Sequence, residues 1–299
     1  MTARKLFSSF LFITIALAAP GCALEADSAK VDGDVFSIGL DTMGGYRDPT
    51  ELPPGSSNGW LPACFWNAHT LNGLRQYATK SLWTDPQTGN IELRPNADID
   101  ALSPECRTQA LQYMIRCALP QDTYVVDPQS GEKIQGWLSV APRWANDRLN
   151  SDDEWWMTSC LTQHLNGFGA EIDLEVDGVK QDANFQKPGA DDPNFPWRDS
   201  HTYGNIFDTA VDVGRVIVYA CHDKSLGERC ASSSDLNMRI CDDDPTIGCN
   251  LVITGACETA CTWSMTEGAY SCGAAGFRTI GSRLKSDEMY RGGGAECRR

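Results

Sequence analysis

Basic residues, histidines and long apolar runs are all scarce in this 299-residue chain. Its 25 Lys and Arg residues face 40 Asp and Glu residues, and the net charge of −15 argues against nucleic acid or anionic lipid headgroups as partners. Beyond the N-terminus, no apolar run is long enough for a membrane-spanning helix. Only four histidines are present, and the zinc, P-loop and dinucleotide-binding patterns are missing, so we expect no metal and no other cofactor.

The N-terminus has the pattern of an export signal. Arg4 and Lys5 are its only charges before residue 25, and the apolar run "LFSSFLFITIALAA" follows them. The small residues of "LAAPGC" then lead to Cys22, as in a lipobox whose cysteine becomes acylated, although Ala19 stands where a lipobox prefers Leu. We therefore predict a signal peptide over residues 1–21 and a lipid anchor on Cys22. Ordinary cleavage with an unmodified thiol is the alternative.

The number of cysteines supports the anchor. The chain has 13 cysteines, and an odd number in an exported protein leaves one without a disulfide partner. Acylation of Cys22 accounts for that one and leaves an even set. The pairing within this set cannot be derived from the spacing. We predict six disulfides among Cys64, Cys106, Cys117, Cys160, Cys221, Cys230, Cys241, Cys249, Cys257, Cys261, Cys272 and Cys297.

Composition divides the mature chain into three parts. Residues 22–59 are polar, acidic and rich in Gly and Pro, as in a flexible tether. Residues 60–220 contain helix and hairpin patterns and form the predicted main domain. Residues 221–299 carry closely spaced cysteines between short strands. The prediction is an α+β fold, with a helix/β-hairpin main domain followed by a disulfide-rich, strand- and loop-rich C-terminal module.

Two helices are expected early in the main domain. Apolar spacing predicts one over residues 61–72, weakened at Gly73. Ser103 and Pro104 begin the other, which Pro120 ends. Cys106 and Cys117 on this helix would be about 16 Å apart and cannot bond to each other.

Further along, "TYVVDPQSGEKIQGWLSV" predicts a hairpin. A helix is expected from Ser151, with Glu154 completing a capping box. "EIDLEVDG" predicts a strand whose acidic residues, including Glu175, face outward. Residues 178–200 are expected to form a long loop, and residues 214–221 another strand.

Catalytic candidates are weak. "RDSHTYGN" places Ser200 and His201 side by side, but neighbouring residues seldom converge as a catalytic triad requires. We expect this string to be a loop in which short polar side chains bind the local backbone. Ser200 and His201 nevertheless remain the best candidates for a catalytic pair in the chain.

Two binding hypotheses are also weak. Asp242, Asp243 and Asp244 could bind a hard cation inside a small disulfide loop, but the alternating pattern of a calcium loop is missing, so a solvated turn is favoured. His164 follows Cys160 by one turn on an apolar helix face, as a core histidine does. The nine tryptophans are expected mainly in the core, with a carbohydrate or peptide groove as the alternative.

Several strings in order carry a resemblance: "LNGL", "LQYMIRCALP", "GWLSVAPRW", "WWMTSCLTQHLNGFG", "YGNIF" and "GACETACT…GAYSC". On these strings, which extend over roughly residues 71–275, the chain resembles a family of cysteine-rich envelope lipoproteins of myxobacteria. Where many relatives have "EGAFYGN" or "EGCFFGN", this chain has "RDSHTYGN". The resemblance implies an exported lipoprotein facing the periplasm or the cell surface. It implies no catalytic residues, because the family has no established reaction.

The expected function is therefore that of an exported, lipid-anchored envelope protein, held at the outer membrane, with a structural, adhesive or ligand-binding role. Its expected partners are the membrane, through the anchor, and a surface carbohydrate, peptide or protein. One alternative is an exported hydrolase that uses Ser200 or His201. Another is a carbohydrate- or peptide-binding module that uses the tryptophans. The residues favour a role without catalysis.

Overall fold

The computed structural model describes residues 56–167, 172–178, 180, 183, 195, 197–222, 233–242, 244–264 and 269–284. All of them belong to one unit of the chain, Pro49–Arg299. The predicted signal peptide and most of the predicted tether lie outside the described residues, as do Cys22, Cys230, Asp243 and Cys297. Among the described residues, no helix combines the length and the apolar character that crossing a membrane requires.

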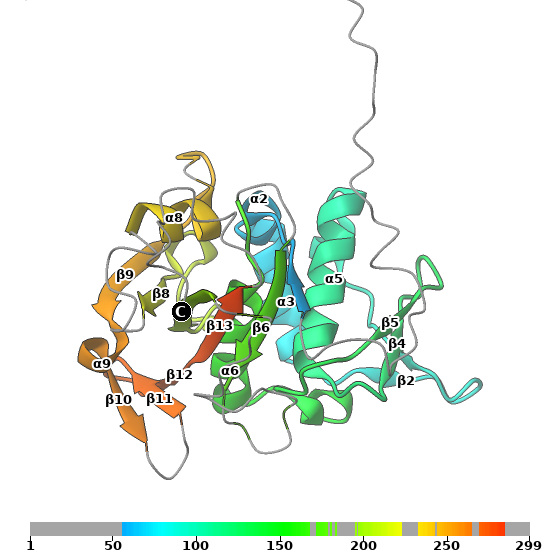
Figure 1. Cartoon of the computed structure of the whole chain (residues 1–299). Helices are drawn as coiled ribbons and strands as arrows, with labels where there is room; N and C mark the ends of the chain where they lie inside the picture. The colour runs from blue at the N-terminus through cyan, green and yellow to red at the C-terminus, as the bar shows by residue number, and fades with distance from the viewer. Residues whose placement is uncertain are drawn as a thin grey trace, which may run out of the picture. The chain divides into compact units, whose positions relative to one another are not determined.

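A six-stranded sheet organises this unit, with its strands in the order β1-β6-β13-β7-β8-β9 (Figure 1). Neighbouring strands are antiparallel except β8 and β9, which are parallel. The strands in sheet order are β1 (Ser56–Asn58), β6 (Ile172–Asp177), β13 (Ile280–Leu284), β7 (Trp197–Gly204), β8 (Val218–His222) and β9 (Leu251–Ala256).

Helices pack against this sheet and against one another. Gln163 at the end of α6 donates hydrogen bonds to the backbone carbonyls of Ser200 in β7 (2.9 Å) and Ile280 in β13 (2.8 Å). The described helices are α2 (Pro62–Phe65), α3 (Ala68–Ala78), α4 (Ala97–Asp100), α5 (Pro104–Ala118), α6 (Ser151–Gln163), α8 (Ser233–Cys241) and α9 (Cys257–Ala260), with 3-10 turns η1 (Pro142–Ala145) and η2 (Val213–Arg215).

Two smaller sheets complete the fold. One has the strand order β2-β3-β4-β5, and the other β10-β11-β12. Their strands are β2 (Trp83–Thr84), β3 (Ile91–Glu92), β4 (Tyr124–Val126), β5 (Lys133–Gln135), β10 (Cys261–Ser264), β11 (Ala269–Cys272) and β12 (Phe277–Arg278). Helices and sheets of mixed direction alternate along the chain, so the predicted α+β class is confirmed.

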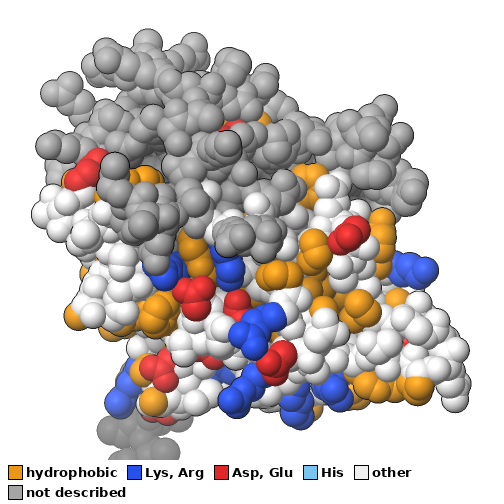
Figure 2. All heavy atoms as spheres, turned by 90° about the horizontal axis from the view of Figure 1, so that it is seen from below, with side chains coloured by type: hydrophobic (Ala, Val, Ile, Leu, Met, Phe, Trp, Pro, Cys, Tyr) orange, Lys and Arg blue, Asp and Glu red, His pale blue; other side chains and the backbone are white. Residues whose placement is uncertain are grey.

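Positive and negative side chains lie next to one another on the face shown in Figure 2. Among the exposed ion pairs of the described residues, Arg143 and Asp147 have an Nη2–Oδ2 distance of 2.8 Å. Exposed pairs of this kind contribute only about 0–1 kcal/mol to stability.

Two predicted elements of the main domain are confirmed. Ser103 caps α5 by accepting a 3.3 Å hydrogen bond from the N–H of Cys106, and Pro104 occupies the first turn. The predicted hairpin is present as the antiparallel strands β4 and β5. Both were recognisable because their caps and turns are local in sequence.

The helix predicted over residues 61–72 is wrong in two respects. Two helices, α2 and α3, occupy this stretch, and Asn67 caps α3 by accepting a 2.8 Å hydrogen bond from the N–H of His69. The second helix also continues through Gly73. A Cβ atom at Gly73 would lie 2.5 Å from Cγ1 of Ile99, so the glycine allows α3 and α4 to pack closely.

The capping box of α6 lies one residue earlier than predicted. Asn150 is the N-cap, and its Oδ1 accepts a 2.8 Å hydrogen bond from the N–H of Asp153. Asp153 Oδ2 accepts one of 3.3 Å from the N–H of Asn150 in return. Glu154, which was predicted to complete the box, therefore has no part in it.

Two predictions for the central sheet are also wrong. Residues 197–204, expected as the end of a loop and a polar turn, form the eight-residue strand β7. Glu175, expected to face solvent, is 1% exposed and stands opposite Arg283, which is 4% exposed. In β7 the polar residues Asp199 and Ser200 are buried with Arg239, a charged partner that is distant in sequence.

Five disulfides join ten of the twelve cysteines predicted to pair. The bonds are Cys64–Cys106, Cys117–Cys160, Cys221–Cys257, Cys241–Cys249 and Cys261–Cys272. Cys106 and Cys117 bond to other partners, as their separation on one helix predicted.

The sheet also bears on the predicted boundaries. The boundary between residues 220 and 221 falls inside β8, and β13 lies between β6 and β7. Strand β1, within the predicted tether, pairs with β6. The described residues on both sides of the predicted boundaries after residues 59 and 220 therefore share one sheet.

Candidate functional site

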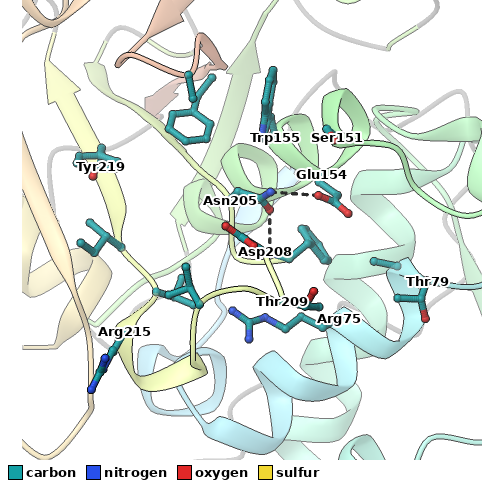
Figure 3. A pocket seen from close by; sticks show the side chains of 17 residues that line it. Arg75, Thr79, Ser151, Glu154, Trp155, Asn205, Asp208, Thr209, Arg215 and Tyr219 are labelled. Atoms are coloured by element: carbon teal, nitrogen blue, oxygen red, sulfur yellow. Dashed lines mark hydrogen bonds between the residues drawn. The ribbon is translucent and has the colours of Figure 1, made fainter.

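A groove of about 630 Å³ lies where β7 ends and β8 begins. Its walls come from the C-terminal end of α3, the first turn of α6, the connection between β7 and β8, and β12 (Figure 3). A volume of this size is typical of sites that bind small molecules.

Glu154, Asn205 and Asp208 lie close together in this groove (Figure 3). Asn205 Nδ2 donates a 3.0 Å hydrogen bond to Glu154 Oε2, and its Oδ1 accepts one of 2.9 Å from the N–H of Phe207. Partial burial raises the pKa of Glu154; the hydrogen bond from Asn205 opposes this, and the charge of Asp208 adds to it. The groove therefore holds a carboxyl group that binds its proton more tightly than a solvated one.

Arg75 reaches the same groove from α3 and is only 8% exposed. Its Nε donates a 2.7 Å hydrogen bond to the carbonyl oxygen of Ile206, whereas its Nη2 is buried without a hydrogen-bond partner in the described part of the chain. Burial lowers the pKa of this guanidinium, and the charges of Asp208 and Asp212 oppose that shift. A buried donor without an acceptor costs about 1–3 kcal/mol, so the fold keeps Arg75 here at a loss of stability.

The connection after β7 is fixed on both sides of the groove. The N–H of Ile206 donates a 3.1 Å hydrogen bond to Thr158 Oγ1 on α6, and its carbonyl oxygen accepts from Arg75 on α3. Ile206 itself is fully buried. The polar groups of the groove are therefore held in position by two helices.

Aromatic side chains form the other wall. Trp155 and Phe277 meet edge to face with their ring centroids 5.6 Å apart. Tyr219 stacks on Tyr203 at 5.2 Å. Aromatic surfaces of this kind pack against apolar side chains and against the faces of sugar rings. The groove thus offers charged groups on one side and apolar contact on the other.

The predicted pair Ser200 and His201 does not meet. Ser200 is 2% exposed, and its Oγ accepts a 2.9 Å hydrogen bond from Arg239 and donates one of 3.1 Å to Asp199. Asp199 and Arg239 form a buried ion pair at 2.9 Å. The ring of His201 packs edge-on against Tyr270, and no hydrogen bond joins it to Ser200 in the described structure. Ser200 therefore forms hydrogen bonds with both members of the buried ion pair.

The predicted acidic cluster lies inside the loop closed by Cys241–Cys249. The N–H of Asp242 bonds to the carbonyl oxygen of Met238 (2.8 Å) at the end of α8. Asp244 accepts hydrogen bonds from the N–H (2.8 Å) and Oγ1 (2.7 Å) of Thr246. The carboxyl group of Asp244 therefore helps to shape the local turn, and Asp242 ends α8 through its backbone N–H.

His164 is buried, and its Nδ1 lies 2.7 Å from the carbonyl oxygen of Cys160. The Sγ atoms of Cys117 and Cys160 lie near its ring, in an arrangement with the ligand types of a metal site. Both sulfurs are joined in a disulfide, however, so neither is a thiolate ligand. The expected role of His164 as a core histidine agrees with this environment.

Most described tryptophans belong to the core, as expected. Trp83 and Trp263 are about 40% exposed, and Trp155 lines the groove. The side chain of Trp197 lies outside the description. The buried ones are Trp60, Trp66, Trp137, Trp144 and Trp156.

Sequence reasoning missed Arg75, Glu154, Asn205 and Asp208. Glu154 was assigned to a helix cap, and nothing local to Arg75 signals that it meets a segment 131 residues away. The strings "WWMTSCLTQHLNGFG" and "YGNIF" contained a signal, since Trp155 of the first and Asn205 of the second both line the groove. Comparison of the chain with protein-family models, with curated proteins and with solved structures finds no match.

Proposed function

We propose that the protein is an exported, lipid-anchored element of the cell envelope that binds a small ligand in the groove between α3, α6 and β12. The groove is the observation that carries the binding role. Arg75 and the carboxyl group of Glu154 line one wall, and Trp155 lines the other. Few convergent polar groups beside aromatic surface are typical of ligand sites.

The proposed lipid anchor and the proposed location in the envelope are supported by observations other than the groove. "LAAPGC" supplies a candidate lipobox at Cys22, and the family resemblance points to an envelope lipoprotein. Five disulfides among the described cysteines suit an oxidising compartment outside the cytoplasm. Together they favour a protein that meets its ligand outside the cell or in the periplasm.

Native mass spectrometry of the protein purified from its own envelope tests both halves of this proposal. We expect a chain that begins at Cys22 with acyl mass attached and that retains a small bound molecule. In a Trp155→Ala variant the bound mass should be lost, whereas Trp83→Ala, which removes an exposed tryptophan of β2, should keep it. A chain that begins elsewhere contradicts the anchor. Equal retention in both variants contradicts binding in the groove.

A further inference from the structure

Two basic and two acidic residues line the groove. Among the described residues they are Arg75, Arg215, Glu154 and Asp208. Figure 3 shows Arg215 pointing away from the other three, whereas the guanidinium of Arg75 extends toward the connection that carries Asp208. The groove therefore brings one buried cation and two carboxyl groups close to the same space.

Resting on the proposed function, we infer that the ligand is a zwitterionic amino acid or short peptide. Its carboxylate binds the guanidinium of Arg75, and its ammonium group faces Glu154 and Asp208. Its side chain packs against Trp155 and Phe277. This arrangement supplies an acceptor beside a guanidinium whose one hydrogen bond within the described part of the chain goes to the carbonyl oxygen of Ile206.

Charge distinguishes this ligand from a neutral sugar. A sugar satisfies the aromatic wall but brings only hydroxyl groups to Arg75. Hydrogen bonds between a guanidinium and a carboxylate are roughly twice as strong as those between neutral groups. A ligand with an anionic group alone would leave Glu154 and Asp208 facing it, and like charges repel. A zwitterion offers a carboxylate to Arg75 and an ammonium group to Glu154 and Asp208.

Three probes test the inference by isothermal titration calorimetry on the disulfide-bonded protein. They are the dipeptide L-alanyl-L-phenylalanine, its C-terminal amide, which lacks the carboxylate, and its N-acetyl derivative, which lacks the ammonium group. We expect the free dipeptide to bind and each modification to weaken binding by about 10-fold or more, the usual effect of losing a hydrogen bond to a charged group.

Variants of the protein test which residue binds the carboxylate of the ligand and which residue faces its ammonium group. In Arg75→Gln the free dipeptide should bind about as weakly as the amide, and in Glu154→Gln the penalty for N-acetylation should shrink. Arg94→Gln is the matched control, because Arg94 Nε also donates to a backbone carbonyl oxygen, that of Ser81, at 2.9 Å. This control should keep wild-type affinity. The amide and N-acetyl probes decide the question on the wild-type protein even if Arg75→Gln fails to fold.

Three results overturn the inference. One is equal affinity for the free dipeptide and its amide. Another is failure of the dipeptide to bind at millimolar concentration, and a third is binding of N-acetylglucosamine oligomers in place of the dipeptide. The proposed function survives each of these if the native protein still retains a bound mass that Trp155→Ala removes.

Discussion

His164 should make the protein less stable in mild acid. The residue is 1% exposed, and its ring lies 5.0 Å from that of Tyr113. Burial lowers its pKa from 6.5 to about 4, the hydrogen bond to the Cys160 carbonyl opposes the shift, and the charges of Arg116 and Arg239 lower it further. The folded protein therefore keeps His164 neutral at a pH where the unfolded chain protonates it.

The sign and size of the effect follow from the two pKa values. Between pH 6.5 and about 4 the unfolded state binds more protons at this site, so the free energy of unfolding falls as the pH is lowered. One unit of pKa difference corresponds to about 1.4 kcal/mol. Acidification from pH 7 to pH 5 should therefore remove roughly 2 kcal/mol through His164 alone.

Urea unfolding at pH 7 and pH 5, with the disulfides intact, measures this loss. Wild type should lose roughly 2 kcal/mol more than His164→Gln over the same interval. Glu154 has the opposite sign, since its raised pKa adds stability as the pH falls, but it is present in both proteins and cancels from the comparison. Equal losses in the two proteins, or an NMR titration of His164 near pH 6.5, would refute the reasoning.

Other perturbations should lower the free energy of unfolding in the same urea assay. Replacing Cys117 and Cys160 together with alanine opens a bond between residues 43 positions apart and should cost about 4 kcal/mol by the loop-entropy relation. Arg239→Met leaves the buried carboxylate of Asp199 without its cation and should cost about 3–5 kcal/mol. Gly73→Ala forces a methyl group against Ile99 and should cost about 1–3 kcal/mol. A loss below about 1 kcal/mol in any of these would contradict the corresponding contact.

The sequence predicted those elements whose signals are local. The helix after Ser103 has its cap and its first-turn proline side by side, and the hairpin over residues 123–140 has its turn residues between two β-rich runs. The even set of cysteines likewise predicted a disulfide framework without its pairing. Each of these depends on a few neighbouring residues or on composition.

Elements whose stability depends on distant residues were misjudged. The string that contains Ser200 is polar enough to predict a loop, yet it forms a strand in the middle of the sheet. It does so because Arg239, 39 residues further on, donates to Ser200 and pairs with Asp199. Glu175 is likewise buried although its strand pattern predicts exposure, and it stands opposite Arg283 of a strand distant in sequence. No sequence pattern within β7 or β6 predicts these partners.

The groove itself depends on a shift of one residue at the start of α6. If Ser151 had been the N-cap, Glu154 would have been the residue whose side chain returns to the helix end. Because Asn150 and Asp153 form the capping box, the carboxyl group of Glu154 is left to accept from Asn205. That bond ties the segment after β7 to α6, and Arg75 ties its next residue to α3. The sequence between Asn150 and Glu154 fits two alignments of a capping box, and only the contacts across the fold show which one leaves Glu154 to line the groove.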